Sequence, residues 1–409
     1  MFKSKRTAER TSPRKKHILI LVENLPVPFD RRVWQEATSL ATRGYEVSVI
    51  CPRTRGYTER YELLEGVHIY RHFLPLEADG VAGFILEYAS GLVGQMTLAL
   101  KAYRRSRIDA IQACNPPDLL FLVAAPFKLL GARFVFDHHD PFPELFQVKF
   151  PRLKRLYRAT RLAEWLTFRM ADRVISTSES LRRMTAERNG KTLDQITLVR
   201  SGPDLQRLQH PPPDPALREG FCHLALYIGI IGQQDGLDLL MQTVAHLVYR
   251  MGRTDTLFLV VGDGPRKSAI EALATELKIA PYLRFTGYLS GAPLFARLAS
   301  ADIGLCCDPK NAMNDTLSMN KVMEYMSFGL PVVQFDLTEN RLLAGDAAVY
   351  AGDDNDPQTL AEAIAALLDD PPRRQTMGNL GRHRVDTDLA WSNQVAAYLG
   401  VYQALIGAP

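Results

Sequence analysis

The chain has 409 residues, of which 46% are hydrophobic and 23% charged, the composition of an ordinary globular protein. A chain of this length is expected to fold as two domains, because single hydrophobic cores rarely extend beyond ~250–300 residues. The cysteines have neither a disulfide framework nor a metal-ligand spacing, which argues against a disulfide-stapled secreted module and favours a reduced, cytoplasmic compartment. They are Cys51, Cys114, Cys222, Cys306 and Cys307.

The formal net charge of +4 is concentrated at one end. Residues 1–16 hold seven Lys or Arg against one Glu, a net of +6, which leaves −2 for the remainder. No apolar segment follows this basic tail, so a secretory signal is not expected. A basic tail can bind an anionic membrane surface, bind nucleic acid or simply be solvated. We predict no nucleic-acid partner, because the remainder has neither a basic face nor a base-stacking motif.

In the first half, short apolar runs alternate with helical patterns, which is typical of a doubly wound parallel sheet. A helix is predicted at 31–43. The segment 80–100 is predicted as a helix packed in the domain, because Glu87 and several glycines make a membrane span unlikely, and an interfacial face is the alternative. The predicted strands are 17–22, 45–50, 108–113, 132–136, 173–177 and 196–199.

The second half repeats this pattern after the proline run at 210–215, which predicts an interdomain linker at 205–220. The predicted strands are 223–228, 256–261, 283–287, 301–307 and 332–335. The predicted helices are 237–249, 267–278, 320–328, 360–368 and 389–405.

Two arginines, Arg31 and Arg32, stand at the start of the first predicted helix. The helix dipole disfavours cations there, so an anionic ligand is expected beside them. The alternative is pairing with Asp30 or Glu36.

A polar cluster at 137–144 follows a predicted strand, where the ligands of doubly wound sheets gather. This cluster is therefore a candidate ligand site. A metal site is the alternative, but the sequence offers no second His/Asp cluster to complete it, so no metal is expected. A strand-end loop held by its own hydrogen bonds would also fit this pattern.

Glycines follow two strands of the second half. Gly229 and Gly232 lie between a strand and a helix, and Gly262 and Gly264 follow the next strand. Such loops let backbone N–H groups approach phosphate, which makes the loop at Gly229 and Gly232 a candidate phosphate-binding loop.

The segment 318–335 reads as a helix, a stop and a strand, with Ser318 as the expected N-cap and Gly329 as the left-handed closing residue. Lys321 and Glu324 share one helix face. An anion near Lys321 would offset its unfavourable place in the first turn, and Glu324 would suit two ribose hydroxyls. The alternative is a solvated surface pair.

Three motifs resemble the family 4 glycosyltransferases of the GT-B fold, and the resemblance covers nearly the whole chain after the tail. The first is Lys321-x-x-Glu324-Tyr325-Met326 with Gly329-x-Pro331-Val332-Val333. The second is Asp137-x-His139-Asp140-x-x-Pro143-Glu144, and the third is the run PFDRRVWQEATSLATRGYEVSVICP at 28–52.

The resemblance implies two Rossmann-like domains facing a cleft: an acceptor domain at 17–204 and a nucleotide-sugar domain at 221–385. It implies a last helix, at 386–409, that crosses back to the first domain. His139 would contact the donor sugar as a catalytic residue with Asp140 and Lys321, and Glu324 would bind the ribose. The other implied donor-binding residues are Gly229, Gly232, Gly262, Gly264, Arg200, Thr316 and Asn320.

Three positions depart from the family pattern. Thr316 stands where many members have a second glutamate, and Ile230 and Asp235 stand where the family has Arg and Lys. Contacts to the donor diphosphate would then fall to Lys321, Arg200 or the pair at 31–32.

The resemblance implies sugar transfer from a nucleoside-diphosphate sugar with retained configuration. It also implies that this reaction needs no cofactor and no obligatory metal. We expect a glycan or polyprenyl-linked acceptor from cell-surface glycan synthesis. The expected location is the cytoplasm, with attachment to the inner, anionic membrane face as an extension. A GT-B sugar-nucleotide epimerase and a non-catalytic nucleotide-sugar-binding partner remain alternatives.

Overall fold

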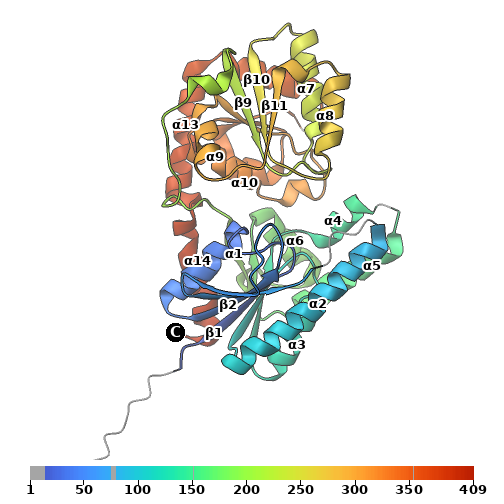
Figure 1. Cartoon of the computed structure of the whole chain (residues 1–409), viewed down its shortest axis with the longest axis vertical. Coiled ribbons are helices and arrows are strands. Elements are labelled where there is room, and N and C mark those ends of the chain that lie inside the picture. The colour runs from blue at the N-terminus through green and yellow to red at the C-terminus, as the bar shows by residue number, and fades with distance from the viewer. Residues whose placement is uncertain (1–13, 75–79, 151, 353) are drawn as a thin grey trace, which may run out of the picture. The chain divides into compact units, whose positions relative to one another are not determined.

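A computed structural model describes residues 14–74, 80–150, 152–352 and 354–409 (Figure 1). Most of the predicted basic tail, residues 1–13, lies outside the described residues. By residue contacts the chain forms two compact units. The first comprises Met1–Asp137, Met170–Asp172 and Leu399–Pro409, and the second comprises His138–Arg169 and Arg173–Tyr398. The predicted division at 205–220 stays a prediction.

The first sheet has eight strands in the order β3-β4-β2-β1-β5-β6-β7-β8. Strand β1 pairs in parallel with both β2 and β5, whereas β3 is antiparallel to β4. The strands are β1 His17–Val22, β2 Glu46–Pro52, β3 Tyr61–Leu64, β4 Val67–His72, β5 Ala110–Cys114, β6 Arg133–His138, β7 Arg173–Ser176 and β8 Ile196–Leu198.

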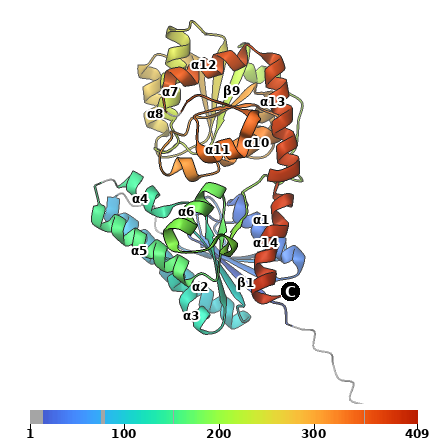
Figure 2. The same cartoon turned by 180° about the vertical axis from the view of Figure 1, so that it is seen from behind.

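The helices of this half are set by local signals at their ends. Helix α1 begins after Asp30, whose carboxylate accepts from the Val33 N–H at 3.1 Å, and ends at Gly44, which has φ 109. In both views α1 and the end of α14 lie side by side, away from α2 and α3 (Figure 2). The helices are α1 Arg31–Arg43, α2 Gly80–Arg105, α3 Phe121–Leu129, α4 Phe142–Lys149, α5 Lys154–Met170 and α6 Glu179–Asn189.

The second sheet has six strands in the order β11-β10-β9-β12-β13-β14, and every recorded pairing in it is parallel. Its strands are β9 His223–Ile228, β10 Thr256–Val261, β11 Leu283–Gly287, β12 Ile303–Cys306, β13 Val332–Gln334 and β14 Ala348–Tyr350. The helices of this half are α7 Leu237–Tyr249, α8 Lys267–Glu276, α9 Ala292–Ser300, α10 Asn320–Ser327, α11 Thr338–Ala344, α12 Pro357–Leu368, α13 Pro371–Arg384 and α14 Trp391–Ile406.

The central strands β9, β10 and β12 are buried on both faces, because nearly all of their residues are apolar. In β9, Ala225 and Tyr227 face a core shared with α7, α8 and α12, and Leu224 and Leu226 face a core shared with α9, α10 and α11 (Figures 1 and 2). Parallel pairing brings the carboxyl ends of β9, β10 and β12 to one edge of the sheet.

Most predicted elements are confirmed, several with the same bounds. Helices α1 and α7 and strands β1, β9, β10 and β11 begin and end where the sequence predicted. The sequence missed β3 and β4, whose alternation of charged and apolar residues gives no continuous apolar run. Among the described residues, no helix is both long and apolar enough to cross a bilayer.

The predicted N-cap at Ser318 is wrong. The N-cap of α10 is Met319, which has no side-chain capping bond, and its N–H donates to Asn340 Oδ1 at 3.3 Å. The Ser318 hydroxyl instead joins tertiary contacts with Arg200 and Glu339. The predicted end of this helix is confirmed, because Gly329 follows it with φ 70.

Candidate functional site

The two glycine loops of the second unit pack against each other backbone to backbone. The Gly229 N–H donates to the Val261 carbonyl at 3.0 Å, and the Ile231 N–H donates to the Asp263 carbonyl at 3.0 Å. Gly262 has φ 157, and a Cβ there would overlap the carbonyl of Gly229. Glycine is therefore required at Gly262 by both backbone conformation and close approach.

Lys321 lies beside the first of these loops. A Cβ at Gly229 would lie 3.4 Å from Lys321 Cε, so the side chain passes close to the loop backbone. The ammonium Nζ donates to Asp308 Oδ2 at 2.8 Å and to the Tyr227 hydroxyl at 3.4 Å, and lies 4.7 Å from the centre of the Tyr227 ring. It is 4.0 Å from Asp235 Oδ1, and the side chain is only 9% exposed.

These neighbours keep Lys321 in its charged form. Burial opposes the charged form, but Asp308, Tyr227 and other nearby groups raise the pKa of Lys321 well above its ordinary value. The predicted solvated Lys–Glu pair is therefore not what the structure contains, because Lys321 is buried against Asp308.

The carboxylate of Asp235 lies in the predicted phosphate loop. Its Oδ2 accepts from the Gly232 N–H at 3.0 Å. Burial raises the pKa of Asp235, Lys321 lowers it and Asp308 raises it again, to a net value of about 6. A carboxylate thus takes a backbone donor that the sequence assigned to phosphate.

Three other predicted donor-binding residues lie on or just before α10. Glu324 is one turn after Lys321 and its side chain is partly exposed, and Asn320 is the first, exposed residue of the helix. The Thr316 hydroxyl donates to the Met313 carbonyl at 2.8 Å, and its own carbonyl accepts from Ser178 at 2.5 Å. Thr316 is therefore hydrogen-bonded to Met313 and Ser178, and does not replace the glutamate that many family members have at this position.

Arg200 is paired inside the second unit. Its Nη1 donates to Glu339 Oε1 at 2.5 Å and to the Ser318 hydroxyl at 2.9 Å. Glu339 is fully buried and also accepts from the N–H of Ser180 at 2.9 Å, at the start of α6. A donor diphosphate would compete with Glu339 for this guanidinium.

Arg32 is also paired with carboxylates, in the first unit. Its guanidinium lies 2.9 Å from Asp137 Oδ1 and 3.0 Å from Glu36 Oε1, and the side chain is 7% exposed. Gln112 donates to the same two carboxylates, at 2.6 Å to Glu36 and 3.0 Å to Asp137. This geometry matches the alternative of pairing with Glu36, and the anion role of Arg31 stays a prediction.

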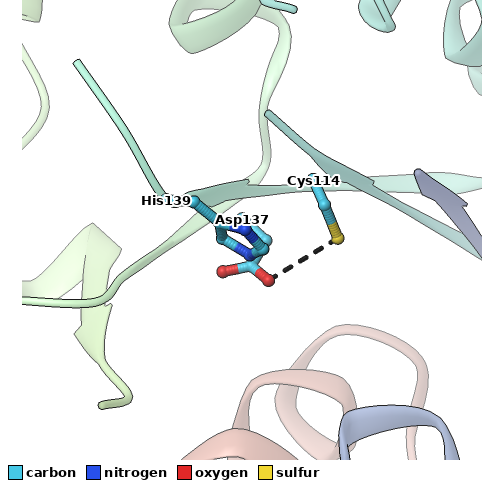
Figure 3. A group of neighbouring side chains, drawn as sticks. All are labelled: Cys114, Asp137 and His139. Atoms are coloured by element: carbon cyan, nitrogen blue, oxygen red, sulfur yellow. Dashed lines mark hydrogen bonds between the residues drawn. The ribbon is translucent and has the colours of Figure 1, made fainter. Parts of the chain in front are cut away.

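Cys114, Asp137 and His139 form a group whose potential ligand atoms lie within 4.8 Å of one another (Figure 3). Burial, followed by the charges of Asp137 and Glu36, raises the pKa of the Cys114 thiol well above its usual value. Asp137 is already engaged by Arg32. The described part of the chain has no other such group, and the expected absence of a metal stays a prediction.

The structure thus brings Lys321, Gly229, Gly232 and Gly262 to one edge of the second sheet. Sequence reasoning missed Asp308 and Tyr227. Asp308 could have been found, because it directly follows a predicted strand at the edge where ligands gather.

Two family models match separate parts of the chain. A model described as Glycosyltransferase Family 4 matches residues 30–207, and one described as Glycosyl transferases group 1 matches residues 222–370. The chain belongs to the glycosyltransferases that these two models describe.

Curated relatives and solved structures are consistent with this family. The chain is 26% identical over 242 residues to a glycogen synthase of Mycobacterium tuberculosis, a match that covers 59% of this chain and 56% of the relative, so the chain spans little more than half of that protein's length. It is 24% identical over 366 residues to the 2-deoxystreptamine glucosyltransferase of Streptomyces kanamyceticus, covering 83% of this chain and 89% of that one.

A solved structure of Anabaena HepE in complex with UDP-glucose matches with a TM-score of 0.71 at 16% identity. The match covers 95% of this chain and 99% of HepE. The fold is therefore GT-B, with two parallel Rossmann-like sheets, as the sequence predicted.

Proposed function

We propose that this protein transfers a sugar from a nucleoside-diphosphate sugar to a glycan or lipid-linked acceptor, with retention of the anomeric configuration. The observation that carries the proposal is the position of Lys321 beside the Gly229 loop, at the carboxyl edge of the second sheet. Ligands of doubly wound sheets bind at this edge. The structural likeness to HepE, solved with UDP-glucose, supports a nucleotide-sugar donor.

The donor diphosphate would bind between the Gly229–Gly232 loop and Lys321. Three N–H donors on the ammonium allow Lys321 to keep Asp308 and still reach a phosphate oxygen. Glu324, one turn further along α10, would accept the ribose hydroxyls, and Asn320 would lie at the helix start beside the phosphates. The loop after β10, with Gly262 and Gly264, would close the other side.

The chemical task is departure of the nucleoside diphosphate from an oxocarbenium-like sugar. Negative charge grows on the diphosphate as this bond breaks, so a cation that is already oriented lowers the barrier without reorganisation. Lys321 is held in this way by Asp308 and the Tyr227 ring. No metal is required for this stabilisation.

His139 and Asp140 are proposed to face the donor sugar. They follow β6 at the carboxyl edge of the first sheet, and the Thr177 hydroxyl donates to the His139 carbonyl at 3.3 Å. That bond holds the backbone of His139 at the strand end. Arg31, and Arg200 once released from Glu339, would supply further positive charge.

The acceptor is proposed to be a glycan or polyprenyl-linked intermediate of cell-surface glycan synthesis. The basic residues of the tail would then hold the protein at the inner, anionic membrane surface, with electrostatic attraction of about 1 kcal/mol per basic residue.

The decisive test has two parts. Thermal unfolding with a panel of UDP-, GDP- and ADP-sugars identifies the donor, since a ligand at ~100 times its Kd adds ~2.7 kcal/mol. NMR of the donor reaction then follows the sugar's anomeric proton. Transfer or hydrolysis with retained configuration supports the proposal. Release of an epimerised nucleotide sugar indicates the epimerase instead, and donor binding without turnover indicates the non-catalytic partner.

A further inference from the structure

A group of buried polar atoms without partners lies in the first unit, at the carboxyl ends of β1 and β4 and on α2. Among the described residues, three side chains there each have one atom with no hydrogen-bond partner: Glu23 Oε1, His72 Nε2 and Gln95 Oε1. Their residues are 1%, 5% and 0% exposed, respectively. We call these three residues the acceptor triad, because each unpartnered atom can accept a hydrogen bond.

The hydrogen bonds of the neighbouring atoms fix these accepting roles. The His72 Nδ1 lies 3.0 Å from the Phe73 carbonyl, which can only accept, so Nδ1 carries the proton and Nε2 has a lone pair. The Gln95 side-chain nitrogen donates to the Val22 carbonyl at 3.1 Å, so the unpartnered atom is its carbonyl oxygen. Burial lowers the pKa of His72, which keeps its ring neutral.

All three side chains lie at one turn of α2: Gln95 belongs to it, and Glu23 and His72 pack against its glycines. A Cβ at Gly91 would lie 2.8 Å from Glu23 Oε1, and a Cβ at Gly94 would lie 2.8 Å from His72 Cβ. Gly91, Gly94 and Gln95 are spaced three and four residues apart, so they share one helix face. The missing side chains at the two glycines give Glu23 and His72 their places against this face.

The charge around Glu23 is negative, whereas the guanidinium of Arg53 acts on His72. Burial, and then the carboxylate of Glu87, raise the pKa of Glu23 to about 8. Burial, with Glu23, Glu87 and Asp118 in turn, raises the pKa of Tyr88. The charged group acting on Glu23 is therefore another carboxylate and not a cation of the protein. A buried acceptor left without a partner costs ~1–3 kcal/mol, more when it is charged.

We propose that the acceptor triad binds a primary ammonium group, and that the sugar acceptor of this protein carries an amine. An ammonium offers three N–H donors and a positive charge, which matches three accepting atoms and the surrounding carboxylates. A hydroxyl offers one donor and no charge, and a phosphate would be repelled. The proposal rests on the proposed function only where it identifies the ligand as the acceptor.

The test compares three monosaccharides by isothermal titration calorimetry at neutral pH: glucosamine, N-acetylglucosamine and glucose. The wild-type protein is expected to bind glucosamine roughly 10- to 100-fold more tightly than the other two, the range of a charge-assisted hydrogen bond. With a pKa of about 8, Glu23 becomes ionised at neutral pH when a bound ammonium lowers that pKa. Glu23→Gln keeps the shape, cannot ionise and adds a donor, so it should abolish the preference. Glu59→Gln, at an exposed position of the same unit, is the matched control and should retain it.

The preference between sugars separates an effect on binding from an effect on folding, because a folding defect weakens the binding of all three sugars alike. Gln95→Leu removes a second accepting atom and should reduce the preference in a protein that retains Glu23. Equal binding of the three sugars by the wild type, no binding of any of them, or an unchanged preference in Glu23→Gln each overturns the proposal. Water alone would then satisfy the acceptor triad.

Donor binding measured in the same preparations keeps the two proposals apart. Stabilisation by a nucleotide sugar without an amine preference overturns the acceptor class and leaves sugar transfer standing. An amine preference without donor stabilisation supports the ammonium site and counts against the proposed function.

Discussion

Arg32 in the first unit and Lys321 in the second are both buried cations beside two carboxylates, at the carboxyl edge of a parallel sheet. Arg32 has carboxylate oxygens at 2.9 and 3.0 Å, and Gln112 bonds to the same two carboxylates. Lys321 has one carboxylate at 2.8 Å, and its second lies at 4.0 Å. Its remaining neighbours are the hydroxyl and ring of Tyr227.

The difference indicates which cation is available to a ligand. A guanidinium bound closely by two carboxylates is compensated, and removing it leaves two buried negative charges. An ammonium with one close carboxylate retains N–H donors and net attraction for an anion. Arg32 and Lys321 both lie at a helix start, and the sequence suggested an anionic ligand for both. Their partners differ, and this difference supports a structural role for Arg32 and a ligand-binding role for Lys321.

The largest expected effect is on folding. Arg32→Met should lower the free energy of unfolding by about 3–5 kcal/mol, because Glu36 and Asp137 lose their buried partner. Chemical denaturation measures this loss, and Arg31→Met, at the exposed neighbouring position, is the control and should change stability far less. Equal effects of the two substitutions would contradict the structural role of Arg32.

Replacing Lys321 should act on catalysis. Lys321→Ala should lower kcat by roughly 10²–10³, the typical loss of one preorganised contact to developing charge. Steady-state kinetics with the identified donor measure the loss, and Lys278→Ala, an exposed lysine of the same unit, is the control. An unchanged kcat would assign the diphosphate to Arg200 or Arg31.

Replacing Glu324 should act on donor binding. The ribose does not change charge during the reaction, so Glu324→Ala should raise KM for the donor by roughly 10- to 100-fold and leave kcat nearly unchanged. The same kinetic series measures both constants. A fall in kcat at unchanged KM would place Glu324 beside the reacting sugar instead.

The smallest expected effect is a pH dependence. The pKa of Asp235 is about 6, so Asp235 is largely neutral below that pH and a carboxylate above it. Its carboxylate competes with the diphosphate for Lys321 and the Gly232 N–H, with Asp308 and Tyr227 as the other facing groups. Donor affinity should therefore fall as pH rises through about 6, roughly tenfold for each unit by which the donor shifts that pKa.

Asp235→Asn should remove most of this dependence and bind the donor more tightly at neutral pH. Titrations of the donor across the pH range, with wild type and variant in parallel, provide the measurement. The same slope in both proteins would trace the dependence to another group.

The sequence alone determined most strands of both sheets, several of the helices and the family. Apolar runs, proline and glycine are local signals, so β9, β10, α1 and α7 could be delimited without a structure. The motifs around Lys321 and His139 carried the resemblance to a glycosyltransferase. The glycine loops and α10 were predicted together because they follow strands of one parallel sheet.

Only the tertiary structure decided which charges meet. Asp308, just after β12, accepts a hydrogen bond from Lys321, and Asp137 in β6 pairs with Arg32. The Ser318 hydroxyl, which was expected to cap a helix, accepts from Arg200 instead. These partners are 13, 105 and 118 residues apart in the chain, and their spacing does not show which side chains touch. The pKa values of Lys321 and Asp235 depend on burial and on such neighbours, so the charge state of the site follows from the fold and not from the motif.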